Sequence, residues 1–139
     1  MLYSYVGRLR FTYEKKCNMK QTFDYLEHVA FAATVCDKEG VVLYQNALSL
    51  KREGNAIGRN LFNCHLEKSN EIIRHMLETG EGNTYQIIRH GHHRMIQQIP
   101  WYEEVGGEVA GLVEIVLDLP DEYPTFDRDK KDYNIQKEK

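Results

Sequence analysis

The sequence predicts an α+β fold, a five-stranded antiparallel sheet with helices on one face that enclose a pocket. Three observations lead to this prediction: two short apolar runs joined by a tight turn within residues 34–46, one long amphipathic segment at Glu67–Thr79, and three strand-like runs after it. A hairpin and a three-stranded meander cannot bury both faces of a sheet by themselves, so the helices are expected to cover one face.

The hairpin opens the predicted sheet. Residues 34–37 form a short strand that ends at Asp37, a Lys-Glu-Gly turn follows, and residues 41–44 form a second strand that continues to Asn46. Two such runs joined by a tight turn are typical of a β-hairpin. Gly40 can adopt the positive φ of that turn at little steric cost.

Four helical segments are predicted before and after the hairpin. Residues 21–30 place apolar side chains at helical spacing, namely Phe23, Leu26, Val29 and Ala30. Ala47–Glu53 is a short helix that Gly54 stops, and residues 57–62 form a compact turn with a short helix. The long helix at Glu67–Thr79 ends at Gly80, a typical C-cap residue. Its apolar stripe consists of Ile72, Ile73, Met76 and Leu77.

Three strands complete the predicted sheet. Residues 84–89 and 92–101 are expected to pair across the His90-Gly91 turn, and residues 108–119 follow the Gly106-Gly107 turn. Pro120 stops the last strand, because proline lacks the backbone N–H that a strand ladder needs. The chain therefore divides into an N-terminal extension with no assigned structure (1–18), one folded domain (19–120), and a charged tail that we expect to be mobile (121–139).

Composition limits the classes of function. Of the 139 residues 42% are hydrophobic and 28% are charged, and no apolar run approaches the ~20 residues of a membrane span, so we expect no membrane association. A net charge of −3 disfavours general nucleic-acid binding. The three cysteines are odd in number and form no Cys-x-x-Cys pair, which disfavours a disulfide framework or zinc site and indicates the reducing cytoplasm.

Four motifs, in order along residues 20–120, resemble those of PAS domains. They are Asp37-Lys38-Glu39-Gly40 with Tyr44-Gln45-Asn46, the turn Ile57-Gly58-Arg59, the segment 63–67 (Asn-Cys-His-Leu-Glu, with Leu66 where many PAS domains have proline), and the last strand 111–119. The segments Cys-His-x-x-Lys-Ser and Gln-x-Pro-Trp-Tyr are also similar to a bacterial group of stand-alone PAS proteins. The resemblance implies a sensory and protein-pairing module, rarely a catalyst.

The resemblance also implies a pocket between the helices and the inner sheet face. Its expected lining is Ile57, Phe62, Cys64, His65, Ile72, Met76, Tyr85, Ile87, Ile96, Gln98, Leu112 and Glu114. Side chains alternate between the two faces along a strand, and the sequence leaves open whether Ile96, Gln98 and Pro100 or the alternate set (Met95, Gln97, Ile99 and Trp101) faces inward. A solid core with the polar groups on the outer face is the alternative.

Cofactor and metal chemistry each lack a residue in the required place. Light-sensing PAS domains carry the adduct-forming cysteine directly after asparagine, and here Leu61 follows Asn60 while Cys64 comes three residues later. A haem sensor needs an axial ligand in the pocket; His75 falls off the apolar stripe of its helix, which leaves His65 or Cys64. The group His90, His92 and His93 is expected to be a solvated turn rather than a metal site, and no catalytic residues are predicted.

The sequence therefore predicts a stand-alone sensory or interaction module that binds a small ligand or a separate signalling protein. The alternative is a small haem- or redox-cofactor-binding protein. A homodimer is expected to form through the apolar stripe of Phe23, Leu26, Val29 and Ala30. The alternative is that this stripe covers the outer face of the chain's own sheet. Pro120 and Pro124 disfavour a helix that continues from the last strand.

Overall fold

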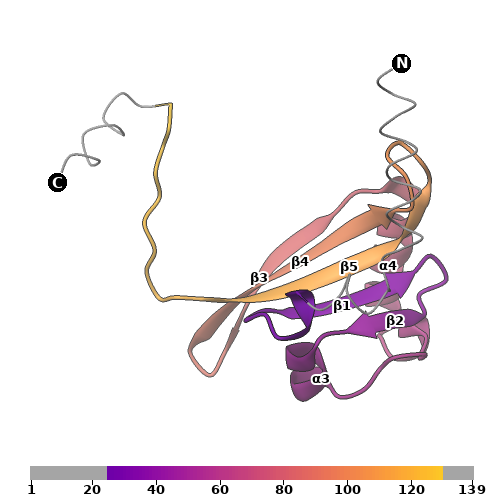
Figure 1. The fold of residues 1–139 in the computed structure, drawn as a ribbon, viewed down its shortest axis with the longest axis horizontal. Coiled ribbons are helices and arrows are strands. Elements are labelled where there is room, and N and C mark those ends of the chain that lie inside the picture. The colour runs from indigo at the N-terminus through magenta and orange to yellow at the C-terminus, as the bar shows by residue number, and fades with distance from the viewer. Residues whose placement is uncertain (1–24, 130–139) are drawn as a thin grey trace.

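The computed structural model describes residues 25–129 and confirms the predicted α+β class (Figure 1). Its elements are β1 (Ala32–Asp37), β2 (Val42–Gln45), α3 (Ala47–Glu53), the 3₁₀ turn η1 (Leu61–Asn63), α4 (Glu67–Thr79), β3 (Asn83–Arg89), β4 (His92–Tyr102) and β5 (Val109–Leu119). The five strands form one antiparallel sheet in the order β2-β1-β5-β4-β3. None of the helices in residues 25–129 is long and apolar enough to cross a membrane.

The last strand of the sequence, β5, lies at the centre of the sheet. It pairs with β1 of the hairpin on one side and with β4 of the meander on the other. The register places Thr34, Glu114, Gln98 and Asn83 opposite one another across four strands. Because side chains directly across a sheet share a face, these four polar residues form one row on the same side.

The helices cover the face of the sheet that carries this row. Ile73 and Met76 of α4 pack with Cys36 of β1 and Leu112 of β5 in the hydrophobic core, next to the half-buried Leu61, Phe62 and Leu77. Ile96 is 5% exposed whereas Ile99 is 40% exposed. The set Ile96, Gln98 and Pro100 is therefore the inward-facing set on β4.

Helix α4 begins and ends where the sequence predicts, but its buried side is rotated. Gly80 has φ 75° and donates its N–H to the Met76 carbonyl, so the predicted C-cap is confirmed. Ile73 and Met76 are buried together with Asn70, whereas Ile72 is 43% exposed. Asn70 belongs to the inner side because its amide donates to the Phe62 carbonyl at 2.9 Å and holds η1 against the helix.

The segment before β1 departs from the prediction of a helix through Ala30. Residues 25–27 are helical and residues 28–31 form a turn and bends, so Val29 and Ala30 do not continue a helical stripe. The cause is the Asn46 side chain, whose Nδ2 donates to the carbonyls of both Leu26 (2.9 Å) and Phe31 (2.8 Å). Phe23 and the predicted extension 1–18 lie outside the described residues.

Asn46 is fully buried and connects three elements. Its Oδ1 accepts from the Ser49 N–H, which caps α3, and from the Ala33 N–H of β1, both at 3.0 Å. Its own backbone N–H donates to the Ala33 carbonyl. With the two bonds from Nδ2, every polar group of this side chain has a partner, as a buried amide requires.

The C-terminal end of α3 is joined to the sheet by a shared carboxylate. Asp118 on β5 accepts from Arg52 of α3 at 2.5 Å and from Arg94 of β4 at 2.9 Å. The hydrogen bond from Arg52, with help from Arg94, lowers the pKa of Asp118. After β5, residues 120–129 contain no helix or strand and run away from the sheet as an extended chain (Figure 1).

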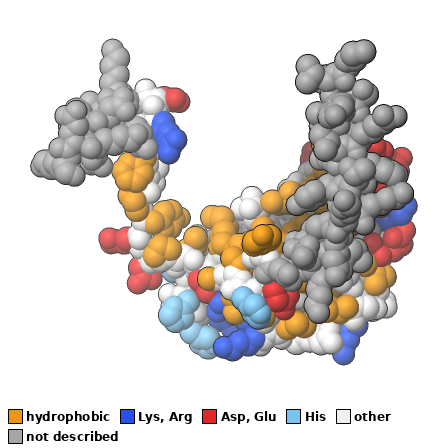
Figure 2. Space-filling model, viewed as in Figure 1, with side chains coloured by type: hydrophobic (Ala, Val, Ile, Leu, Met, Phe, Trp, Pro, Cys, Tyr) orange, Lys and Arg blue, Asp and Glu red, His pale blue; other side chains and the backbone are white. Residues whose placement is uncertain are grey.

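Histidine and basic side chains gather at one end of the sheet. Figure 2 shows them where the β3–β4 hairpin turns, with acidic side chains both near this end and at the opposite end of the sheet. The residues at the hairpin are Arg89, His90, His92, His93 and Arg94. Hydrophobic side chains lie between the two ends.

Replacement of Asn46 by alanine should destabilise the protein by about 3 kcal/mol or more. The cap contributes about 0.5–2 kcal/mol, and each buried partner left unpaired costs about 1–3 kcal/mol. Asn55→Ala is the control, because the Asn55 side chain makes one exposed bond, to the Ile57 N–H, and should cost less than about 1 kcal/mol. Urea denaturation of both variants measures the difference, and equal losses would show that Asn46 does not hold the three elements together.

Replacement of Gly111 by alanine should prevent stable folding. A Cβ at Gly111 of β5 would overlap the Cys36 carbonyl oxygen of β1 and press on the Trp101 indole of β4, both of which approach the glycine closely. Gly106→Ala is the control, since no atom lies within 4 Å and only its φ of +79° is strained, at about 1–2 kcal/mol. Circular dichroism and thermal denaturation compare the two, and a stable Gly111→Ala protein would contradict this close approach.

Candidate functional site

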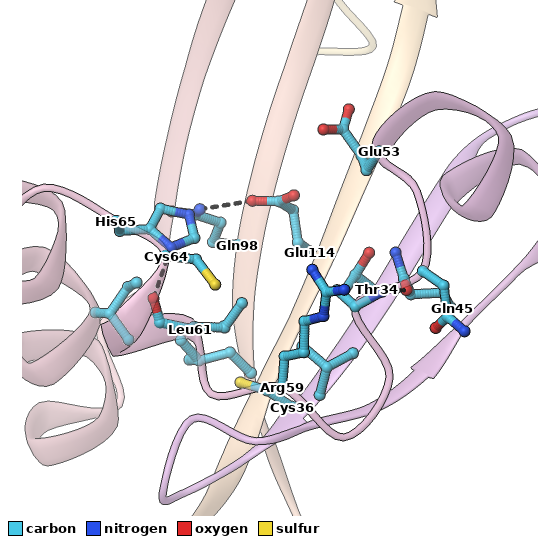
Figure 3. Close-up of a pocket in the computed structure, with 15 residues that line it drawn as sticks. Thr34, Cys36, Gln45, Glu53, Arg59, Leu61, Cys64, His65, Gln98 and Glu114 are labelled. Atoms are coloured by element: carbon cyan, nitrogen blue, oxygen red, sulfur yellow. Dashed lines mark hydrogen bonds between the residues drawn. The ribbon is translucent and has the colours of Figure 1, made fainter.

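A cavity of about 320 Å³ lies between the helices and the inner face of the sheet (Figure 3). Its lining comes from β1, β2, β4 and β5, from α3, η1 and α4, and from the loop 54–60 at its mouth. It is lined by Thr34, Cys36, Val42, Gln45, Glu53, Asn55, Ala56, Arg59, Leu61, Cys64, His65, Ile73, Gln98, Leu112 and Glu114. Residues far apart in the sequence thus meet around one space.

Five of the twelve pocket residues expected from the sequence line this cavity. They are Cys64, His65, Gln98, Leu112 and Glu114. Gln98 and Glu114 do so because they belong to the inward-facing polar row, and Cys64 and His65 because they follow directly after η1.

The other seven expected residues lie elsewhere, for three physical reasons. Met76 and Ile96 are buried in the core, and Phe62 packs on the core cluster beside them. Ile57 at a loop tip and Ile72 on the outer side of α4 are 47% and 43% exposed. Tyr85 and Ile87 stand on the edge strand β3 and are also partly exposed, at 43% and 37%.

The floor of the cavity is apolar. Val42, Leu112 and Ile73 are buried at 1%, 6% and 6% exposure, and Leu61 is half-buried. The Cys36 thiol is also part of the floor, and burial, followed by the nearby negative charges of Asp37 and Glu114, raises its pKa. Cys36 therefore stays a neutral, weakly polar group there.

One wall carries a relay of hydrogen bonds that fixes a carboxylate. Asn83 Nδ2 donates to Gln98 Oε1 at 3.0 Å. Gln98 Nε2 in turn donates to Glu114 Oε2 at 2.7 Å (Figure 3). The bond from Asn83 sets which end of the Gln98 amide faces Glu114. Burial and the Glu114 charge raise the pKa of nearby Tyr85, so this phenol remains neutral.

The mouth of the cavity is held in place by Gln45. Its Oε1 accepts from the Ala56 N–H at 2.7 Å, and its Nε2 donates to Ser49 and to the Gly54 carbonyl. The Arg59 carbonyl accepts from the Val42 N–H at 2.9 Å, which ties the other end of the loop to β2. The loop that carries Ala56 and Arg59 is therefore attached to the sheet at both ends.

The sequence alone did not predict ten of the lining residues, although several of them lie in hairpin and helix segments that it did predict. The hairpin predicted from the sequence contains Thr34, Cys36, Val42 and Gln45, but the face on which each side chain lies depends on the pairing of β1 with β5. Glu53, Asn55, Ala56 and Arg59 lie at the end of a predicted helix and in the turn after it. Leu61 and Ile73 were placed in predicted helices without being assigned to the pocket.

The histidines considered as haem ligands differ in position. His65 Nδ1 contacts the Leu61 carbonyl at 2.8 Å, and its ring lines the cavity mouth. His75 contacts Glu81 at 2.8 Å on the exposed side of α4 and does not line the cavity. No group of three histidine, cysteine or acidic side chains within residues 25–129 is arranged to hold a metal ion.

No family model and no curated protein matches the chain, but solved structures do. VqmA of Vibrio cholerae, a dimer solved in the absence of its target DNA, has a TM-score of 0.57 and 20% identity over 76% of this chain and 52% of VqmA. A structure of VqmA bound to DPO has the same TM-score and identity, over 75% and 58% of the two chains. The chain thus spans little more than half the length of VqmA.

Two matches cover almost the whole of the compared chain. A PAS domain from Colwellia psychrerythraea has a TM-score of 0.53 and 20% identity, over 73% of this chain and 96% of that domain. A sensory box histidine kinase structure from Vibrio cholerae has a TM-score of 0.53 and 13% identity, over 86% and 99%. The sheet order, the helices on one face and these likenesses together show that the chain has a PAS-like fold.

Proposed function

We propose that this chain is a sensory module, not an enzyme, that binds a small molecule in the cavity and passes its state to another protein chain. The observation that carries the proposal is the cavity itself, with an apolar floor and a few polar groups held by hydrogen bonds. Small-molecule sites typically combine these two features. VqmA, which is similar in fold, supports the proposal because it binds DPO.

The size of the cavity favours a small ligand. At about 320 Å³ it lies near the lower end of the ~300–1,000 Å³ that ligand pockets span. Its polar groups favour binding over catalysis, since the Cys36 thiol has a raised pKa and so is a poor nucleophile at neutral pH.

We also propose that the protein acts in the cytoplasm as a homodimer, with a signalling protein rather than nucleic acid as its partner. The net charge of −3 and the free thiols of Cys36 and Cys64 support the location and the partner class. Leu26 supports the dimer, since it belongs to the expected surface of Phe23, Leu26, Val29 and Ala30 and is 37% exposed. VqmA is likewise described as a dimer.

Occupancy of the cavity can be tested with Ala56→Trp, which should fill the mouth and abolish ligand binding. Ala56 lines the cavity, and only its backbone N–H is needed by Gln45. We expect compounds from a fragment library of neutral, cationic and anionic molecules to raise the melting temperature of the unmodified protein but not of this variant. The matched control is Val105→Trp, because Val105 is 91% exposed and lies outside the cavity lining.

A compound that stabilises Ala56→Trp as strongly as the unmodified protein would place its binding elsewhere and contradict the proposal. The purified protein should also be colourless, and a haem or flavin absorption band would favour the cofactor-binding alternative. Tryptophan at Met76 or Ile96 is not a suitable test, since these side chains are in the core and overpacking there costs about 1–3 kcal/mol.

The dimer proposal predicts that Leu26→Arg gives a monomer. A charged side chain at this position would have to be desolvated in the interface, which is costly without a partner. Val105→Arg adds the same charge at an exposed site and should remain dimeric. Light scattering coupled to size exclusion measures both masses. If Leu26→Arg remains a dimer, this surface is not the interface. A shortened chain of residues 1–120 that is monomeric would also contradict the proposal.

A further inference from the structure

The charged groups of the cavity lie at different depths. Glu114 is half-buried on the central strand, whereas Glu53, Arg59 and His65 are exposed around the mouth. The cavity lining therefore holds two carboxylates and one guanidinium. Within residues 25–129 none of these three charged side chains forms an ion pair.

The Glu114 carboxylate is oriented by the protein but only partly satisfied. Oε2 accepts the bond from Gln98, and Oε1 accepts none from the part of the chain that the structure describes. An ionised carboxylate can accept about four hydrogen bonds. A half-buried carboxylate with an open oxygen that forms no ion pair within residues 25–129 favours a ligand that brings N–H donors and positive charge.

The neighbours of Glu114 do not supply that charge. Burial and the Glu114 charge raise the pKa of Tyr85, and burial with the Asp37 and Glu114 charges raises the pKa of Cys36, so both stay neutral. Neutral groups here avoid like-charge repulsion and leave Glu114 as the main charge of the inner wall. An anionic ligand would meet this carboxylate and the Glu53 carboxylate at the mouth, which disfavours it.

Arg59 provides the complementary group at the mouth. Its backbone is tied to β2 by the bond from the Val42 N–H, and its side chain lines the cavity. Figure 3 shows this side chain extending from its loop toward the strands that carry Glu114 and Thr34. Because a guanidinium donates in a planar fork, it is suited to bind a carboxylate.

We propose that the ligand is a small zwitterion with an apolar body, in which an ammonium group binds Glu114 and a carboxylate binds Arg59. The inference rests on the proposed ligand-binding function and names its ligand class. The body of the ligand lies on the apolar floor formed by Val42, Ile73 and Leu112. The amino group enters first because the unpaired carboxylate is the deeper of the two charged groups.

Three probes with nearly the same branched hydrocarbon body test this assignment. L-Leucine carries both charges, 3-methylbutylamine carries only the ammonium group, and 4-methylpentanoate carries only the carboxylate. Amide shifts of the ¹⁵N-labelled full chain, at constant pH and ionic strength, give the affinities. We expect L-leucine to bind most tightly, 3-methylbutylamine more weakly, and 4-methylpentanoate least.

Two variants connect the affinities to the side chains. Glu114→Gln should weaken the binding of L-leucine and of 3-methylbutylamine about 10- to 100-fold, the usual range for a charge-assisted hydrogen bond. The glutamine retains an acceptor for Gln98. Arg59→Gln should weaken the binding of L-leucine about two- to fivefold, as for an exposed ion pair, and leave the affinity for 3-methylbutylamine unchanged. Glu108→Gln is the control, because it removes the same charge at an exposed site outside the cavity.

The results separate this inference from the function on which it rests. Tightest binding of 4-methylpentanoate, or equal affinities in Glu114→Gln and Glu108→Gln, would overturn the zwitterion. The same holds if none of the three probes binds. If the Ala56→Trp comparison still shows cavity binding of another compound, the proposed function stands without this ligand class; if that comparison fails too, both are wrong.

Discussion

The fold depends on a single buried amide, the side chain of Asn46. It binds backbone groups of the segment before β1, of β1 itself and of α3, so it fixes where the hairpin ends and where the first helix begins. Without it, the Leu26 and Phe31 carbonyls and the Ala33 N–H would each need another partner in a place that water does not easily reach. The positions of α3 and of the loop after it, which forms the cavity mouth, follow from this junction.

The central position of β5 explains why the cavity has a polar wall. Strand β5 receives β1 on one side and β4 on the other, and this brings Thr34, Glu114 and Gln98 together from distant parts of the chain. The row could not form within one hairpin. The relay from Asn83 through Gln98 then turns a sheet surface into an oriented acceptor, which is the chemical basis of the proposed ligand preference.

Local signals predicted the elements well, whereas long-range pairing determined the site. Ala47–Glu53 and Glu67–Thr79 begin and end as predicted because their caps, Asn46, Gly54 and Gly80, are local features of the chain. The inward face of β4 depends on its register with β5, and the buried side of α4 depends on Asn70 reaching η1. Neither follows from periodicity, so the sequence favours Ile72 over Ile73 for the pocket and gives no indication that Arg59 lines it.

Trp101 gives the molecule a built-in optical reporter. It is the only tryptophan of the chain, and its indole N–H crosses Gly111 to donate to the Cys36 carbonyl at 2.9 Å. The thiol of the same cysteine lines the cavity floor on the other face of the sheet. Because indole emission responds to the hydrogen bond and polarity around its nitrogen, any movement of Cys36 against a ligand changes the intrinsic fluorescence, without a dye or label.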